Sequence, residues 1–261
     1  VSLLALRMLF SLPFFVISAA FSSSRESNVR FTAKEWIAVA GIGCLGYYVS
    51  SLLDFLGLQY VSAGIERLIL FIYPTLVLLM TSLVFKQRIS SIQWIAVAIT
   101  YIGLALAFVS EWDFYADKSV NFMLGASLIF ACAITYAIYI VGSGRIIPKV
   151  GAAKFNSYAM TFACLGVLVH FFIESDTSLL SFETDVYLYG FAMAILSTVI
   201  PSYLVSEGIK RIGSNNAAIV GSVGPVSTII QAYFFLDEPI LGLQIVGTIL
   251  ILVGVFMIGK R

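Results

Sequence analysis

Nine long apolar segments, separated by short polar connections, constrain this chain more than any other feature of its sequence. A helix needs about 20 mainly apolar residues to cross the hydrocarbon core of a bilayer, which is about 30 Å thick. The segments that meet this requirement are residues 2–21, 35–53, 62–85, 90–109, 120–143, 150–172, 186–206, 214–235 and 240–259. All of them are too long for the strands of a membrane barrel. The sequence therefore predicts an all-α integral membrane protein with nine transmembrane helices.

The charged residues are too few to cover a water-facing surface. They make up 11% of the chain and hydrophobic residues make up 60%, whereas a soluble domain carries about 25% charged residues. The net charge of +1 excludes a nucleic-acid binder held by a broad basic surface. The three cysteines lie in apolar runs and lack the spacing of a metal site or redox pair. We expect neither a cofactor nor a bound metal.

The basic residues are concentrated in the connections on one side of the membrane. If the nine segments alternate in direction, twelve of the fifteen Lys and Arg residues fall on one side, namely Arg25, Arg30, Lys34, Lys86, Arg88, Arg145, Lys149, Lys154, Lys210, Arg211, Lys260 and Arg261. The connections on the other side are acidic and carry Lys118 as their one basic residue. Because Lys and Arg favour cytoplasmic loops, we predict a cytoplasmic C-terminus. We expect the plasma membrane, here the inner membrane of a bacterium.

The two ends of the chain also resemble each other. A shift of 151 residues without gaps aligns four apolar segments and their connections, and the matched pairs include Gly57 with Gly208, Pro74 with Pro225, and Gly103 with Gly254. The first copy begins on the outer side and the second on the inner side, so the copies are inverted in the membrane. Inverted repeats are typical of secondary transporters, whose substrate site lies near the midplane between the copies.

The fifth segment, residues 120–143, has no counterpart in the first copy. A repeat of five helices would place that counterpart before Val1. We therefore expect these nine helices to come from a 5+5 inverted-repeat bundle of ten helices whose first helix is missing here. Residues 1–110 form the first predicted repeat and residues 120–261 the second.

Several short stretches carry a resemblance to a known family. They are Ala5-Leu6-Arg7-Met8, the run from Gly57 to Gly64, Pro74 with the apolar run that ends in Lys86-Gln87-Arg88-Ile89, and Gly224-Pro225 through Leu236-Asp237-Glu238-Pro239. Over nearly its whole length the chain resembles the EamA family of the drug/metabolite transporter superfamily. Phe85-Lys86-Gln87 departs from the Gly-Glu pair that is common there. The resemblance implies ten helices, alternating access, and transport or export of small metabolites, and it names no particular metabolite.

Ionisable residues inside the apolar segments are the first candidates for function. Each costs about 2.5–3.5 kcal/mol at the centre of a membrane helix, so it usually faces the bundle interior or water. Glu66 and Arg67 are adjacent, and adjacent helical residues point about 100° apart. We therefore expect their partners on other helices, with Arg7 and Asp54 as candidates. Their functional interpretation is an outer gate, or a carboxylate at Glu66 that takes up a proton coupled to substrate movement. The alternative is a structural ion pair that fixes helix packing, or charged side chains that snorkel to the interface.

Prolines and tyrosines suggest where the bundle opens. Tyr73 follows Glu66 by seven residues, which places both on one face of a continuous helix, and Pro74 removes a backbone hydrogen bond beside it. Pro225 repeats this feature at the symmetric position. The two prolines could produce paired kinks that free carbonyl groups to line a central cavity, although membrane helices often tolerate proline without such a role.

Two polar stripes complete the set of candidates. Tyr136 and Tyr139 share one face of segment 120–143 with Cys132 and Ser143, and Tyr47, Ser51 and Asp54 form a similar stripe on segment 35–53. Tyrosine hydroxyl groups deep in a membrane need hydrogen-bond partners. Both a polar substrate cavity and ordinary core packing explain these stripes.

The leading interpretation is a transporter that moves a small solute by alternating access. The chain has no Gly-x-x-x-x-Gly-Lys-Ser/Thr motif, so we expect proton coupling or exchange in place of ATP. An intramembrane enzyme would need clustered catalytic groups, and those of this chain are scattered; we predict that it is not an enzyme. A scaffold would leave the inverted repeat unexplained. The expected partners are a small-molecule substrate and the lipid bilayer, and a homodimer remains open.

Overall fold

The computed structural model describes residues 2–23, 30–61, 63–86, 88–115, 121–174, 179, 182–224, 226, 227, 230, 234 and 242–259. Within these residues every regular element is a helix. In chain order the elements are α1 (Ser2–Ser23), α2 (Ala33–Gly43), η1 (Cys44–Val49), α3 (Ser50–Gly57), α4 (Ala63–Leu70), α5 (Tyr73–Phe85), α6 (Ser91–Tyr115), α7 (Phe122–Val150), α8 (Ala152–Glu174), α9 (Thr184–Met193), η2 (Ala194–Val199), α10 (Ile200–Val220), η3 (Gly221–Val223) and α12 (Gly242–Gly259).

The lengths and apolar composition of these helices fit a membrane protein. Among the described residues, five helical stretches are long and apolar enough to span a bilayer: Ser2–Ser23, Ala33–Gly57, Phe122–Val150, Ala152–Glu174 and Thr184–Val223. Three shorter apolar helices are Tyr73–Phe85, Ser91–Leu106 and Ile245–Met257. The predicted all-α membrane architecture is confirmed. The count of nine spans stays a prediction, because the segment predicted over 214–235 is described only in part.

The chain divides into two compact units. The first consists of residues 1–52 and 138–214, and the second of residues 53–137 and 215–261. Each unit therefore takes helices from both predicted repeats, and the boundaries fall within α3, α7 and α10. At Gly213 the backbone leaves the helical conformation, with a φ of 77°, which is a conformation that glycine adopts without steric cost.

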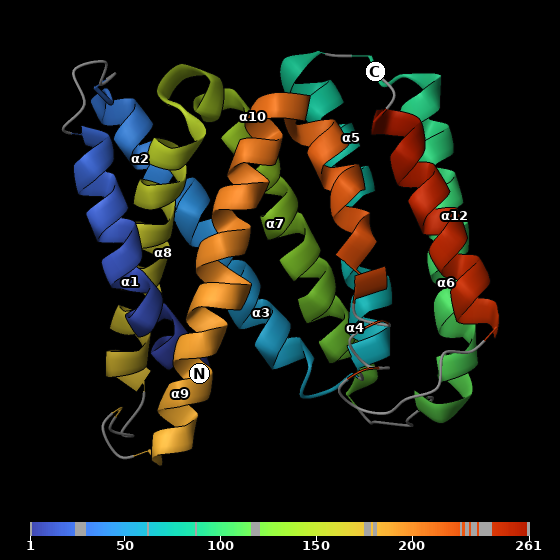
Figure 1. The fold of residues 1–261 in the computed structure, drawn as a ribbon, viewed down its shortest axis with the longest axis horizontal. Helices are drawn as coiled ribbons and strands as arrows, with labels where there is room; N and C mark the ends of the chain where they lie inside the picture. Colours follow the sequence, from blue (N-terminus) through green and yellow to red (C-terminus); the bar gives the residue numbers. More distant parts are fainter. Residues whose placement is uncertain are drawn as a thin grey trace. The chain divides into compact units, whose positions relative to one another are not determined.

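In the first unit, α1 packs antiparallel against α8 (Figure 1). The Sγ atom of Cys164 lies 3.7 Å from Sδ of Met8 near the start of α1. Towards the other end of α1, Ser157 donates a hydrogen bond of 2.9 Å to Ser18. Small and polar residues at this contact let the two backbones approach closely, as is usual between membrane helices.

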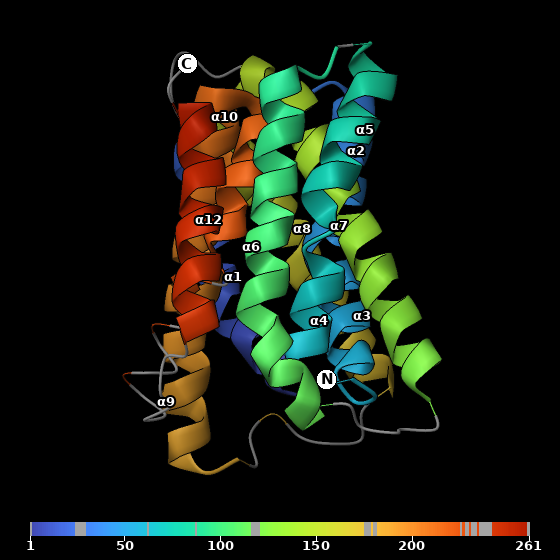
Figure 2. The ribbon, with the colours of Figure 1, turned by 90° about the vertical axis from the view of Figure 1, so that its right-hand side faces the viewer.

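In the second unit, α6 packs antiparallel against α12, and both views show the two helices side by side (Figures 1 and 2). Glycines set the distance between them. A Cβ atom at Gly103 would lie 2.6 Å from the carbonyl oxygen of Gly247, and one at Gly254 would lie 2.8 Å from that of Ala96. These two glycines are a matched pair of the sequence repeat, so each repeat contributes the same small residue to one contact.

Both antiparallel pairs consist of counterparts in the predicted repeats. Helices α1 and α8 correspond to the first and sixth apolar segments, and α6 and α12 to the fourth and ninth. Two copies related by an axis in the membrane plane run in opposite directions. Antiparallel packing between counterparts is therefore the arrangement that an inverted repeat requires.

Two long helices of the first unit contain a π-helical turn. In η1 the N–H of Ser50 donates to the carbonyl of Leu45, and in η2 the N–H of Ile200 donates to that of Ile195. Both bonds span five residues, where an α-helix spans four. The two turns lie 150 residues apart, one residue from the offset of the sequence repeat.

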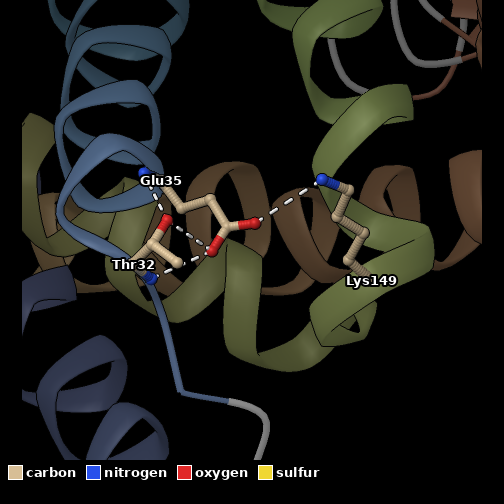
Figure 3. A network of polar contacts seen from close by, with 3 residues as sticks. All are labelled: Thr32, Glu35 and Lys149. Carbon is tan, nitrogen blue, oxygen red and sulfur yellow. Dashed lines mark hydrogen bonds and ion pairs between the residues drawn. The ribbon is translucent and has the colours of Figure 1, made fainter.

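A polar cap fixes the start of α2 (Figure 3). The backbone N–H of Thr32 donates to Oε2 of Glu35 over 2.9 Å, and the N–H of Glu35 donates to the Thr32 hydroxyl over 3.3 Å. This reciprocal pair is a capping box. Nζ of Lys149, near the end of α7, lies 3.6 Å from Oε1 of Glu35. The two connections, which the charge pattern assigns to one side of the membrane, thus meet at one end of the unit.

Candidate functional site

A pair of acidic side chains lies inside the second unit. Asp54 belongs to α3 and Glu66 to α4, and their carboxyl groups are close enough for each to be affected by the charge of the other. Glu66 is 8% exposed. Two neighbouring carboxyl groups disfavour the state in which both are ionised, because like charges repel. The structure thus brings together three of the four ionisable residues that the sequence pointed to, Asp54, Glu66 and Arg67, and Arg67 lies beside the adjacent Glu66, although its partner was expected on another helix.

Arg67 and Cys132 are the charged and titratable neighbours of this pair. Nε of Arg67 lies 4.0 Å from Oε2 of Glu66, a distance that allows attraction and is too long for a hydrogen bond. The buried thiol of Cys132, on α7, is close enough to both acids to sense their charges. Among the described side chains, the groups that interact electrostatically with the two acids are therefore one thiol, that of Cys132, and one guanidinium group, that of Arg67.

The helix that carries Glu66 is interrupted. Helix α4 ends at Leu70 and α5 begins at Tyr73, and between them the N–H of Ile72 donates to the carbonyl of Ile69 over 3.2 Å. The structure here differs from the prediction of one continuous helix over 62–85. Pro74 stands in the first turn of α5, where a missing N–H does no harm. Glu66 and Tyr73 therefore lie on two separate helices, α4 and α5.

Tyr73 and Tyr136 pack against each other beyond this interruption. Their ring centroids are 5.3 Å apart at an interplanar angle of 76°. The hydroxyl of Tyr73 donates to the carbonyl of Ala218 over 3.0 Å, and a Cβ atom at Gly221 would collide with that hydroxyl. Tyr73 is buried. Its hydrogen bond is made within the protein, which is the packing role that the sequence left open.

The first unit holds a second polar group, centred on Tyr139. Tyr139 is fully buried near the polar side chains of Ser206 and Ser143, and the rings of Tyr47 and Tyr139 meet edge to face at 5.0 Å. Gly46, next to Tyr47, packs so closely on the Tyr139 ring that a Cβ atom would collide with it. The two tyrosines that the sequence placed on separate stripes therefore lie together.

The same polar group contains residues that the sequence reasoning missed. Asn156 on α8 donates to the hydroxyl of Ser202 over 3.0 Å and accepts from Ser206 over 3.1 Å. All three are fully buried. The sequence did contain signals for this group. Asn156 lies inside one apolar segment, and Ser202 and Ser206 lie four residues apart on another. These side chains are neither ionisable nor aromatic, so neither the cost of burying a charge nor the hydrogen-bonding need of a membrane tyrosine pointed to them.

The remaining candidates cannot be joined to the acidic pair. Arg7 lies on α1 in the first unit, near Cys164, so its predicted interaction with Glu66 stays a prediction. Pro225 lies outside the described residues. Among the residues that are described, no group of three or more His, Cys, Asp or Glu side chains is placed to hold a metal ion.

Apolar helices long enough to cross a bilayer, with few charges and with the acid Glu66 buried among them, define a multi-pass membrane protein. The sequence pattern of the EamA-like transporter family matches residues 1–109 and 123–260, and the chain belongs to this family.

Similar proteins agree with this assignment. The uncharacterized transporter YcbK of Bacillus subtilis is 35% identical over 212 residues, which cover 79% of this chain and 67% of that protein. The uncharacterized transporter YyaM of the same organism is 25% identical over 232 residues, covering 88% of this chain and 74% of that protein. A solved crystal structure has the same fold, with a TM-score of 0.77 and 18% identity over 99% of this chain and 87% of that one.

Proposed function

We propose that this membrane transporter moves a small solute by alternating access, and that the Asp54–Glu66 pair takes up and releases the proton that couples to the movement. The observation that carries the proposal is the burial of Glu66 inside a membrane protein, with a second acid, Asp54, close enough to affect its charge. Ionisable residues at such positions are usually retained for proton or substrate movement, because they are costly to bury.

The two protonation states of the pair favour different surroundings. With one shared proton the pair carries a single negative charge, and with two protons it is neutral. A charge is far more costly than a neutral polar group in an apolar medium. The neutral state therefore favours a closed arrangement and the charged state favours contact with water, and a ligand that binds one state better shifts the population toward it.

The interrupted helix supports the same mechanism. Secondary transporters commonly build their sites from discontinuous helices, because free backbone groups are tolerated at membrane depth only within protein or beside water. The break at Phe71 and Ile72 lies one turn after Glu66. The movement of α4 relative to α5 at this break would alter the access of water to the acidic pair.

The solute, the direction of transport and the membrane belong to the same proposal. We propose a plasma-membrane location with a cytoplasmic C-terminus, on the basis of the predicted charge asymmetry. The matched relatives are described only as uncharacterized transporters, so amino acids, nucleobases and sugars are the solute classes to screen. Exchange of one solute for another, without a net proton flux, is the alternative mode.

The test is uptake of pooled radiolabelled amino acids, nucleobases and sugars into liposomes that contain the protein, with and without a pH gradient. Glu66→Gln and Asp54→Asn remove the exchangeable carboxyl groups. Glu174→Gln is the matched control, because Glu174 is an acid with a 67% exposed side chain, paired with His170 at 2.9 Å.

We expect uptake that rises with an inward proton gradient, is lost in the Glu66 and Asp54 variants, and survives in the control. Uptake that is independent of the gradient and persists in both variants would show that the acidic pair has a structural role and does not couple protons to transport. An absence of uptake for every pool would contradict transport of these solute classes.

A further inference from the structure

Two helices of the first predicted repeat begin with the same polar motif. At the start of α6 the backbone N–H of Ser90 donates to Oε1 of Gln93 over 3.1 Å, and the N–H of Gln93 donates to the Ser90 hydroxyl over 3.2 Å. This is the reciprocal pairing that Thr32 and Glu35 form at the start of α2. A capping box needs a hydroxyl residue followed three positions later by Glu or Gln. Both helix starts therefore follow one design.

In both motifs the last residue has a second partner, on a helix of the second predicted repeat. Oε2 of Glu35 accepts from Thr32, while Oε1 lies 3.6 Å from Nζ of Lys149 on α7 (Figure 3). Oε1 of Gln93 accepts from Ser90, while Nε2 donates to Oδ1 of Asn216 on α10 over 3.1 Å. Each side chain thus uses one atom for its cap and the other for a bridge. The first bridge lies in the first unit and the second bridge in the second unit.

A close apolar contact lies behind the Glu35–Lys149 bridge. Ile42 follows Glu35 by seven residues and Gly142 precedes Lys149 by seven residues, and seven residues make about two helical turns. Each member of this second pair therefore lies on the same face of its helix as the bridge. A Cβ atom at Gly142 would lie 2.6 Å from Cδ1 of Ile42. Helices α2 and α7 thus touch at two levels, with the ion pair at the outer level.

The Gln93–Asn216 bridge stands in the same relation to an apolar cluster. Val97 lies one turn after Gln93, and Ile219 lies one turn after Asn216. Val97 and Ile219 are buried and belong to one cluster with Leu78. In both units a polar bridge between the predicted repeats therefore covers the end of a packed apolar contact.

The Glu35–Lys149 bridge is not repeated by the symmetry of the sequence. The offset of 151 residues places Val186 at the counterpart position of Glu35, and valine has no group that could form an ion pair. The counterpart helix α9 begins at the N-cap Glu183, which makes no side-chain cap hydrogen bond. The charge pattern assigns all four bridging residues to the predicted cytoplasmic side. A contact that is present at one end of an inverted repeat and lacks a counterpart at the other favours closure of that one end.

We propose that the Glu35–Lys149 and Gln93–Asn216 bridges are two latches of an inner gate, which hold the predicted repeats together while the cytoplasmic side is closed and separate when it opens. The inference rests on the alternating access of the proposed function. When one repeat rocks against the other, contacts within a repeat persist and contacts between repeats change. The two capping boxes are of the first kind, and the two bridges are of the second.

The test uses substitutions that remove the bridges and keep the caps. Lys149→Ala and Asn216→Ala delete the partner on the second repeat. Glu35→Gln removes the charge of the first bridge, while glutamine can still complete a capping box. Glu207→Gln is the matched control, because it breaks ion pairs with Lys210 and Arg211 that lie within α10 on the same predicted side.

Opening of the gate is measured with two cysteine reporters, Ile42→Cys behind the first bridge and Val97→Cys behind the second. Each is placed in a protein whose native cysteines, Cys44, Cys132 and Cys164, are replaced by alanine. Inside-out vesicles are treated with a membrane-impermeant maleimide, and the rate of labelling is followed without added solute or pH gradient. The thermal midpoint of each variant in detergent shows whether it is folded.

We expect Lys149→Ala, Glu35→Gln and Asn216→Ala each to raise the labelling rate about two- to fivefold, the size of effect that fits exposed polar contacts. Because a rocking repeat opens as a whole, each substitution should raise labelling at both reporters. The combination of Glu35→Gln with Lys149→Ala should exceed neither single variant, since both remove one interaction. Glu207→Gln should label as the unaltered protein does.

Unchanged labelling in the bridge variants would overturn the inner gate. A substitution that exposes only the reporter in its own unit would also overturn it, because a local packing contact gives that result. If Lys149→Ala or Asn216→Ala fails to fold, the conservative Glu35→Gln must still expose both reporters. Labelling requires no transported solute, so an absence of uptake for every solute pool would count against the proposed function and would not change this result.

Discussion

At the scale of single residues, glycines and buried polar side chains determine how closely the helices approach. Gly103 and Gly254 allow contact between α6 and α12, and Gly46 allows the Tyr139 ring to lie against η1. Each contact leaves no room for a methyl group. Since membrane helices gain their affinity from close packing and not from the hydrophobic effect, these small residues contribute more to stability than their size suggests.

Replacement of Gly103 should therefore destabilise the second unit. We expect Gly103→Leu to cost about 1–3 kcal/mol, the usual range for overpacking, because the new side chain meets the backbone of α12. Gly41→Leu is the control, since nothing lies within 4 Å of a Cβ atom there. Thermal unfolding in detergent measures both. Equal midpoints for the two variants would show that α6 and α12 separate easily.

At the scale of elements, the interruptions of the helices are as informative as the helices themselves. The break between α4 and α5 and the two π turns lie in apolar stretches that otherwise read as continuous spans. A broken or displaced backbone inside a membrane must be stabilised by neighbouring groups. In η1 Ser50 donates to the carbonyl of Gly46, and in η2 Ser202 donates to that of Val199. These buried serines indicate that the irregular turns are maintained by the sequence.

Pro74 provides a test of the break between α4 and α5. Its replacement by alanine restores an N–H that can donate to the carbonyl of Leu70, which favours a continuous helix. We expect Pro74→Ala to keep or raise the thermal midpoint and to lower solute uptake several-fold. Pro13→Ala is the matched control, because Pro13 lies within the unbroken helix α1. Full uptake with Pro74→Ala would show that the break has no part in transport.

These interruptions also mark the limit of what the sequence could predict. The long apolar runs revealed the helices, because lipid demands continuous apolar surface over a whole span. Hydropathy does not depend on which carbonyl accepts from each backbone N–H, so it could not predict the π turns η1 and η2. Pro74 was interpreted as a kink within one helix. The proximity of Asp54 to Glu66 was among the expected pairings. Asn156 was missed because its importance depends on two serines from another helix.

At the scale of the whole molecule, the chain is a membrane transporter of the EamA-like family whose compact units each combine helices of both predicted repeats. Helices α1 and α8, and likewise α6 and α12, pack antiparallel, which is the relative direction expected of counterparts in the predicted inverted repeat. The charge pattern predicts a direction for this arrangement, because Lys and Arg favour cytoplasmic loops.

The orientation can be tested with two exposed positions. The side chain of Lys149 is 60% exposed and that of Glu174 is 67% exposed, and they fall on opposite predicted sides. We expect Glu174→Cys to react with a membrane-impermeant maleimide in intact cells, and Lys149→Cys to react only after the cells are opened. The unaltered chain, which contains Cys44, Cys132 and Cys164, gives the background. The reverse pattern would invert the proposed topology.

The measurement that tests the central claim most directly is proton movement driven by solute. Liposomes that contain the protein and a pH-sensitive dye are given an outward gradient of a transported solute, with no initial difference in pH. If the Asp54–Glu66 pair couples the two flows, the internal pH changes with the unaltered protein and stays constant with Glu66→Gln. Solute efflux without a pH change, or an equal pH change with Glu66→Gln, would contradict the role assigned to this pair.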